Sequence, residues 1–190
     1  DVDFNYPGKE TLKNSDAGID PSNVWNNWGP ISFRDFTGLP PSIALQRIDG
    51  TPSGITLQST ILGTGAGPNG VVGVSPGNAT VDYWYGDNTH PVIEFKATGL
   101  KTAKTYKLVF YASRRTDGQT ADNRETSFKV TGGNTQTQTL NEFGNSGNAA
   151  TITGVKPDAD GNVVIHVNKG AANTNVTGYF YLNLMQISLE

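Results

Sequence analysis

The clearest structural signal in the chain is the run Thr105-Tyr106-Lys107-Leu108-Val109-Phe110-Tyr111-Ala112-Ser113. Successive side chains of a strand point to opposite faces. This run therefore gathers four apolar or aromatic side chains on one face: Tyr106, Leu108, Phe110 and Ala112. Val109 and Tyr111 fall on the other face, so that face is also half covered. The pattern indicates a strand in a sheet that packs against a second layer.

The same two-residue alternation recurs on both sides of this run, and helical periodicity is nearly absent. Nine strands are predicted, spaced by turn signals, at residues 42–48, 53–59, 92–96, 105–113, 125–130, 135–140, 151–155, 163–167 and 179–189. Asp49-Gly50 joins the first two as a hairpin. Many short strands at such spacing are typical of a β-sandwich or jelly roll. We predict an all-β fold with a single domain over residues 1–190.

Two stretches are less regular. Up to Pro40 the alternation is weak, and we expect residues 24–28 and 33–36 to pack as a flap over the sheets. Residues 63–77 are rich in glycine but too apolar for a linker, so we expect a long ordered loop.

The amino-acid composition excludes some classes of binding partner. The chain of 190 residues has 14 basic and 17 acidic side chains, a formal net charge of -3. Nucleic-acid binding needs a basic surface for the phosphates, so we expect none. We also expect no membrane span, because the longest apolar stretches are strand-sized and a spanning helix needs about 20 residues. The chain has no cysteine, which excludes disulfides and thiol chemistry.

A catalytic set cannot be assembled from the sequence. His90 precedes a proline in a turn, and His166 alternates with apolar residues of a strand. Neither belongs to a known nucleophile or metal motif. Carboxylates such as Glu94 and Glu125 occupy outward strand positions. We therefore predict that the chain is not an enzyme.

One segment has some likeness to a calcium loop. Asp158-Ala159-Asp160-Gly161-Asn162 carries oxygen ligands but lacks the distal glutamate of an EF-hand. A turn between strands favours the same residue types for backbone reasons, and we prefer that interpretation. Asp1 and Asp3 point to an ion equally weakly. We predict no cofactor and no metal site.

Two aromatic clusters are the first candidates for ligand binding: Trp25-Asn26-Asn27-Trp28 and Tyr83-Trp84-Tyr85-Gly86-Asp87-Asn88. Aromatic rings offer flat apolar faces to sugar C–H groups, and neighbouring amides select hydroxyls. The alternative is a core role. For Trp25 and Trp28 the choice between a core role and ligand binding stays open. For Trp84 a core role is slightly favoured, and Tyr83 and Tyr85 would then face away from the core.

The ends of two strands supply the second candidate. Arg114 and Arg115 end one strand, and Asn123-Arg124 opens the next. A hairpin would bring three guanidinium groups around residues 116–121, where they could hold hydroxyls or a uronate. For Arg124, in phase with inward-facing Phe128, we favour a structural role. The candidate ligand-binding residues are thus Trp25, Trp28, Trp84, Tyr85, Arg114, Arg115 and Asn123.

Several stretches resemble a family of β-sandwich modules found in secreted or surface proteins of bacteria. They are residues 104–114 and 122–132, which look like paired strands of that family, together with 154–161, 178–187, Trp25-Asn26-Asn27 and 82–86. These modules look like galactose-binding-domain-like jelly rolls and often accompany polysaccharide-degrading enzymes. Calcium-bearing relatives carry an acidic residue just before the isoleucine of the last strand. Here Met185 and Gln186 precede Ile187, which argues against that metal.

The resemblance implies a non-catalytic carbohydrate-binding module, accessory to a secreted glycan-active enzyme, that binds a polysaccharide or oligosaccharide and contacts other domains of a larger parent protein. The expected location is secreted or at the cell surface. The alternative is a structural or protein-interaction module of a bacterial surface protein. That alternative predicts buried aromatic side chains and no concave polar pocket.

Overall fold

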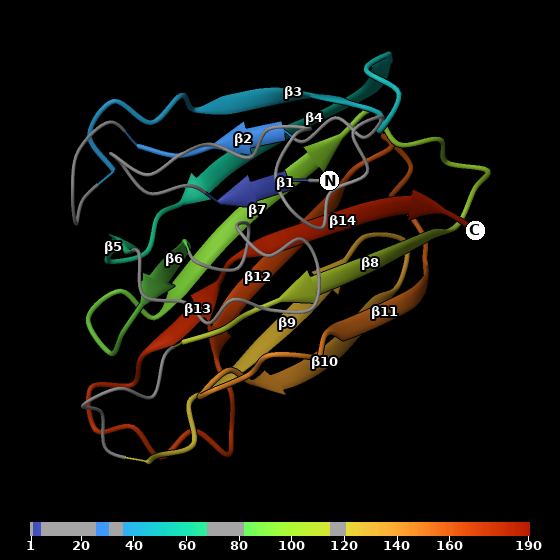
Figure 1. The fold of residues 1–190 in the computed structure, drawn as a ribbon. Helices are drawn as coiled ribbons and strands as arrows, with labels where there is room; N and C mark the ends of the chain where they lie inside the picture. The colour runs from blue at the N-terminus through green and yellow to red at the C-terminus, as the bar shows by residue number, and fades with distance from the viewer. Residues whose placement is uncertain (1, 5–25, 31–35, 68–81, 115–120) are drawn as a thin grey trace.

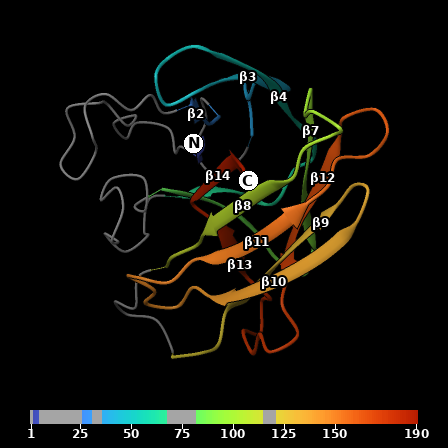
Figure 2. The same cartoon turned by 90° about the vertical axis from the view of Figure 1, so that its right-hand side faces the viewer.

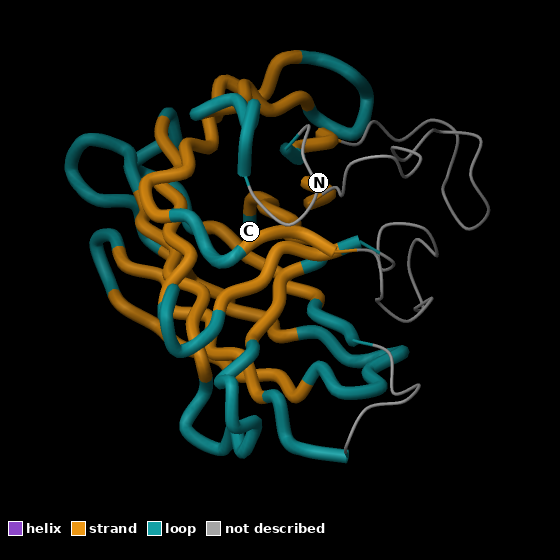
Figure 3. The backbone as a smooth tube through the Cα atoms, turned by 90° about the vertical axis from the view of Figure 1, so that its left-hand side faces the viewer, coloured by secondary structure: helices purple, strands orange, loops and turns teal. Residues whose placement is uncertain are grey.

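The computed structural model describes residues 2–4, 26–30, 36–67, 82–114 and 121–190. This part of the chain consists of strands joined by turns and loops, and it contains no helix (Figure 3). Accordingly, it offers no helix long and apolar enough to cross a membrane. The predicted all-β class is confirmed.

Two large sheets form a sandwich (Figure 1, Figure 2). The first sheet has five strands, in the order β11 (Ala150–Val155), β8 (Tyr106–Tyr111), β14 (Leu184–Leu189), β1 (Val2–Phe4) and β2 (Asn26–Trp28). The second sheet has six, in the order β10 (Thr135–Asn141), β9 (Glu125–Thr131), β12 (Val163–Lys169), β7 (Val92–Thr98), β4 (Pro52–Ile61) and β3 (Ser42–Gln46). All neighbours are antiparallel except β1 and β2.

A third, small sheet lies at one end of the sandwich. It contains β13 (Phe180–Leu182), β6 (Tyr83–Gly86) and β5 (Gly65–Gly67), in that order. Residues 83–86, which are not among the nine predicted strands, form β6. Residues 63–67, the described part of the predicted long loop, include β5.

The core lies between the two large sheets. The predicted inward face of β8 is confirmed, since Tyr106, Leu108, Phe110 and Ala112 are all buried. Phe110 of β8 stacks on Phe128 of β9, with ring centroids 4.7 Å apart and planes 9° apart. One ring from each sheet therefore meets in the middle. Stacked aromatic pairs of this kind stabilise a core beyond the area they bury.

All nine predicted strands are present, and the hairpin predicted across Asp49-Gly50 is the β3–β4 pair. The last predicted strand is divided at the buried residue Asn183, where the chain passes from the third sheet to the first. The backbone N–H of Ser113 donates to Oδ1 of Asn183 at 2.7 Å, and the N–H of Asn183 donates to the carbonyl oxygen of Tyr111 at 3.0 Å. These bonds fix the point at which β13 ends and β14 joins the first sheet.

One topological expectation is wrong. The strands before and after residues 115–120 do not form a hairpin: β8 pairs with β11 and β14, whereas β9 pairs with β10 and β12. The chain instead crosses from the first sheet to the second. The strong alternation of both segments specified strands correctly, but alternation carries no information on which strands become neighbours.

Candidate functional site

Four tyrosines share one face of the third sheet, and we call Tyr83, Tyr85, Tyr179 and Tyr181 the tyrosine face. Tyr85 of β6 is the direct cross-strand partner of Tyr181 of β13. Ring centroids are 4.8 Å apart for Tyr83 and Tyr181 and 5.9 Å apart for Tyr85 and Tyr179. Both pairs are edge-to-face, an arrangement favoured by the ring quadrupoles. Tyr83 and Tyr181 are buried, while Tyr85 and Tyr179 are partly exposed.

The tyrosine face follows from a repeated sequence pattern. Tyr83-Trp84-Tyr85 and Tyr179-Phe180-Tyr181 each place two tyrosines on one side of the backbone and an apolar ring on the other. Trp84 and Phe180 are fully buried in the core. The two segments are antiparallel neighbours, so their tyrosines are brought together. The sequence interpretation included Tyr85 but missed Tyr179 and Tyr181, although the matching pattern was readable.

Two predicted tryptophan ligands need correction. Trp28 is 2% exposed and Trp84 is fully buried. Their ring centroids lie 5.3 Å apart, and both rings contact Phe95 of the second sheet. The indole N–H of Trp28 donates to the carbonyl oxygen of Pro40 at 3.0 Å. Neither ring can stack on a sugar, because each has no free face. Trp25 and Arg115 lie outside the described residues.

Arg114 extends the tyrosine face. Its guanidinium lies 5.8 Å from the ring centroid of Tyr83, within range of a cation–π contact. Its backbone is held on both sides: its N–H donates to the Glu142 carbonyl oxygen at 2.9 Å, and its own carbonyl accepts from Gly144 at 2.8 Å. The side chain remains partly exposed. Arg114 thus brings a positive charge to the edge of the tyrosine face on a fixed backbone.

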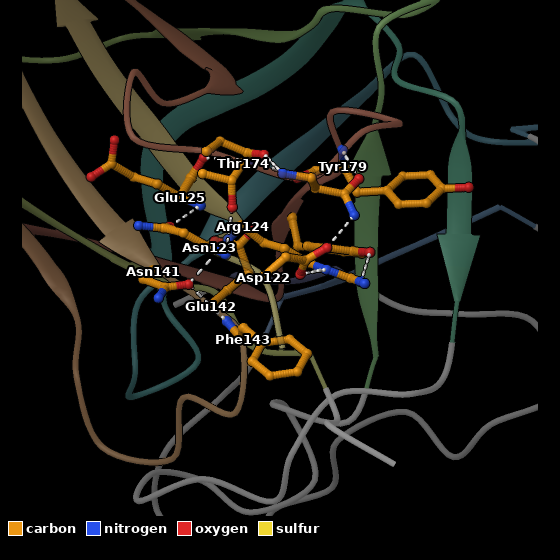
Figure 4. Close-up of polar contacts among 12 residues, drawn as sticks. Asp122, Asn123, Arg124, Glu125, Asn141, Glu142, Phe143, Thr174 and Tyr179 are labelled. Atoms are coloured by element: carbon orange, nitrogen blue, oxygen red, sulfur yellow. Dashed lines mark hydrogen bonds and ion pairs between the residues drawn. The ribbon is translucent and has the colours of Figure 1, made fainter. Parts of the chain in front are cut away.

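A buried arginine, Arg124, lies beside Asp122 and Tyr179 (Figure 4). Arg124 is 4% exposed. Its Nε donates to Oδ1 of Asp122 at 2.7 Å, and its Nη1 donates to the hydroxyl of Tyr181 at 3.0 Å. Its guanidinium also lies 6.0 Å from the ring centroid of Tyr179. The structural role expected for Arg124 agrees with this geometry, since the side chain ties a loop carboxylate to the tyrosine face.

The loop before β13 is held by the same carboxylate. The side-chain amide of Asn175 donates to Oδ2 of Asp122 at 2.6 Å, while its Oδ1 accepts from the backbone N–H of Tyr179 at 3.1 Å. Hydrogen bonds from Asn175 and Arg124 outweigh burial and lower the pKa of Asp122. The position of Tyr179 therefore depends on an ionised carboxylate two contacts away.

Asn123 is oriented by local bonds. Its Oδ1 accepts from the N–H of Glu125 at 2.9 Å, an Asx turn that starts β9. Its backbone exchanges bonds with Thr174, through the hydroxyl at 3.0 Å and through the N–H of Thr174 at 2.7 Å. The side chain is partly exposed beside Asp122 and Arg124. Of the predicted site residues, Arg114 contacts the tyrosine face, whereas Asn123 serves the turn into β9.

Beneath this arrangement lies a buried carboxyl group. Glu142 is fully buried, and its Oε1 accepts from the hydroxyl of Thr126 at 3.0 Å. Its other oxygen has no hydrogen-bond partner among the described residues. Burial raises the pKa of Glu142 well above its usual range. Burial likewise raises the pKa of the Tyr181 hydroxyl, so that phenol stays protonated at physiological pH.

The segment likened to a calcium loop is a self-bonded turn. Oδ1 of Asp158 accepts from the backbone N–H groups of Asp160, at 3.0 Å, and Asn162, at 2.8 Å. Gly161 adopts φ 76°, which glycine permits. The carboxylate is thus used by the turn itself, as preferred from the sequence. Within the described ranges, no group of three or more metal-ligating side chains occurs.

The histidines have the expected placements. His90 is exposed in a turn, and His166 lies on the outer face of the second sheet. The ring of His166 contacts the carboxylate of Glu94, its cross-strand partner, at 2.5 Å. The described residues place no nucleophile-and-base pair beside the tyrosine face. What the site offers is partly exposed rings, one peripheral guanidinium and fixed amides, a combination suited to binding.

Comparisons with known proteins give a limited result. No family model matches the chain, and no curated protein matches it. Two chains among solved structures match. One is the carbohydrate-binding module TmCBM61, solved in complex with beta-1,4-galactotriose. It is 14% identical, and the match covers 73% of this chain and 90% of that chain with a TM-score of 0.38.

Proposed function

We propose that this chain is a non-catalytic carbohydrate-binding module of the galactose-binding-domain-like kind, and that the tyrosine face with Arg114 binds an oligosaccharide or polysaccharide. The module would act outside the cell as an accessory domain, raising the concentration of a glycan-active partner enzyme at its substrate. Residues 1–190 would form one domain of a larger parent protein.

The observation that carries the proposal is the partial exposure of Tyr85 and Tyr179 on a rigid tyrosine face. A bound sugar needs an apolar surface for its C–H groups and directed donors and acceptors for its hydroxyls. Tyr85 and Tyr179 offer ring area and phenol groups, and Arg114 adds a guanidinium at the border. The contacts of Arg124 and Asp122 hold Tyr181 and the backbone of Tyr179 in place, which reduces the ordering cost of binding.

Binding to a panel of plant, algal and host polysaccharides tests the function. Affinity electrophoresis or a glycan array should give at least one saturable interaction. Tyr179→Ala and Tyr85→Ala should each weaken it by about tenfold or more, about 1.4 kcal/mol. Tyr179→Phe is the matched control, since it keeps the ring and the packing but removes the hydroxyl. It should retain most of the affinity if the ring face provides the main contact.

Two results would count against the proposal. Absence of binding to every polysaccharide would argue against carbohydrate recognition as a whole. Binding that survives both alanine substitutions would place the ligand elsewhere on the molecule. Circular dichroism and the unfolding midpoint of each variant separate a lost contact from a lost fold, because Tyr85 and Tyr179 also pack against each other.

The second candidate function is a structural or protein-interaction module. This candidate predicts buried aromatic side chains: the burial of Trp28 and Trp84 favours it, and the partial exposure of Tyr85 and Tyr179 does not. It also predicts that alanine at Tyr85 or Tyr179 alters stability without altering any glycan interaction. The same variants therefore distinguish the two functions.

A further inference from the structure

A second candidate site lies at the opposite end of the sandwich from the tyrosine face. There a pocket of about 500 Å³ opens between the two large sheets. The direction of the strands shows the separation: β8 begins at the pocket with Tyr106 and ends three residues before Arg114, and β14 runs from the third sheet towards Leu189 at the pocket. None of its lining residues belongs to the tyrosine face.

The pocket has an aliphatic floor. Leu45 and Ile55 come from the β3–β4 hairpin, Ile187 from β14 and Val2 from β1, and the ring of Tyr106 closes one side. Leu45, Val2 and Tyr106 are buried, whereas Ile55 and Ile187 are partly exposed. Ile48, which is 52% exposed, stands at the border. A pocket of this volume and lining is of the size that encloses small organic ligands.

The charges around this floor have one sign. Arg47, Lys101 and Lys107 line the pocket, and its described lining residues include no aspartate or glutamate. The chain as a whole carries a net charge of -3, so the charge around the pocket is opposite in sign to that of the whole chain. Arg47 is used within its hairpin, where Nη1 donates to the hydroxyl of Thr51 at 3.1 Å. Lys101 and Lys107 are exposed and make no ion pair with any described residue.

Several polar groups near the floor are already bonded within the protein. The hydroxyl of Ser53 donates to the carbonyl oxygen of Leu45 at 2.6 Å, and the hydroxyl of Tyr106 accepts from the N–H of Lys101 at 2.7 Å. Both backbone groups of Gln46 bond to the side chain of Asn26. A neutral sugar would have to place hydroxyls against the aliphatic floor, which is unfavourable. An apolar body with a single anionic head fits better.

We propose that this pocket binds a small amphiphilic carboxylate, with its acyl body on the Leu45–Ile55–Ile187 floor and its head near Lys101 and Lys107. Apolar burial supplies the affinity, and the ammonium groups select the charge of the head. The site acts independently of glycan binding at the tyrosine face.

Titration calorimetry with octanoate on the full chain tests the proposal. Octanamide is the matched neutral probe, since it has the same acyl body and no charge. Octanoate should bind with a stoichiometry of one, about tenfold more tightly than octanamide. The double substitution Lys101→Gln/Lys107→Gln should weaken octanoate binding by about tenfold and leave octanamide unchanged. Lys104→Gln should change neither, since Lys104 is exposed on the same turn but does not line the pocket.

Chemical-shift changes of backbone amides in ¹⁵N-labelled protein show where octanoate binds. Octanoate should move the amides of Ile55, Lys101 and Ile187 and leave those of Tyr85 and Tyr179 in place. The proposal is overturned by absence of saturable octanoate binding, by equal affinity for octanamide, by full affinity in the double variant, or by shifts confined to another surface. Loss of glycan binding in the tyrosine variants has no bearing on any of these results.

Discussion

The side-chain amide of Asn26 bonds both backbone groups of Gln46. Nδ2 of Asn26 donates to the carbonyl oxygen of Gln46 at 3.0 Å, and Oδ1 accepts from its N–H at 2.8 Å. Asn26 belongs to β2, the edge of the first sheet, and Gln46 ends β3, the edge of the second sheet. One buried amide thus continues the hydrogen bonding of an edge strand across the open side of the sandwich, where unpaired strand groups would otherwise remain.

Substitution of Asn26 by leucine should destabilise the fold by about 2–3 kcal/mol, because two backbone groups of Gln46 then lose their partners in a partly buried place. Urea denaturation measures the change. Gln46→Ala is the control: both bonds from Asn26 reach the backbone of Gln46, and the Gln46 side chain is exposed, so stability should change by no more than about 0.5 kcal/mol. Equal losses in the two variants would contradict this account.

Two glycines with the same backbone conformation should differ in their tolerance of alanine. Gly54 has φ 80° and Gly99 has φ 81°. A Cβ on Gly54 would meet nothing within 4 Å, whereas a Cβ on Gly99 would collide with the carbonyl oxygen of Gly54. Gly54→Ala should therefore cost only the left-handed strain, about 1 kcal/mol. Gly99→Ala should cost at least about 1 kcal/mol more, as a lower thermal midpoint would show.

Glu142 should make stability fall as pH rises. Burial raises the pKa of its carboxyl in the native state, so the native protein holds this proton at pH values where the unfolded chain has released it. The contribution is complete below the unfolded pKa, about 4.3, and is lost as pH rises towards the raised native value. Glu142→Gln removes the titration but keeps an acceptor for Thr126. Relative to wild type, the variant should gain stability between pH 4 and the raised native pKa in urea denaturation series.

Asp122 has the opposite effect: it should make stability fall as pH falls. Burial alone would raise its pKa, but hydrogen bonds from Asn175 and Arg124 outweigh it and leave the pKa lowered. Its stabilising contribution is present above the unfolded pKa, about 3.9, and is lost as pH falls through the lowered native value. Asp122→Asn should cost about 1–2 kcal/mol at pH 7, and the difference from wild type should shrink below pH 4. A constant difference across that range would exclude the ion pair as its source.

The sequence located the long strands but not their neighbours. Alternation in residues 105–113 and in the other eight runs marked strands that the structure confirms, because burial of one face imposes a period of two. The short strands β1, β2, β5 and β6 were not predicted. Which strands pair depends on contacts far apart in sequence, and the expected β8–β9 hairpin failed for that reason. The site shows the same division. Arg114 lies at the tyrosine face as expected, but Tyr179 and Asp122 were missed because only β6–β13 pairing and the Asn175 contact bring them there.

The tryptophans give a direct optical test of the core. Trp28 and Trp84 are shielded, and Trp25 is the third tryptophan of the chain. In a Trp25→Phe variant all indole emission comes from the two buried rings. It should be blue-shifted, and acrylamide should quench it several-fold less than it quenches free tryptophan in water. Urea should then restore full quenching in the same transition that removes the β-sheet signal in circular dichroism, because both rings contact Phe95 between the sheets. Strong quenching in the folded variant would show that Trp28 or Trp84 is open to solvent, and would return that ring to the candidates for ligand binding.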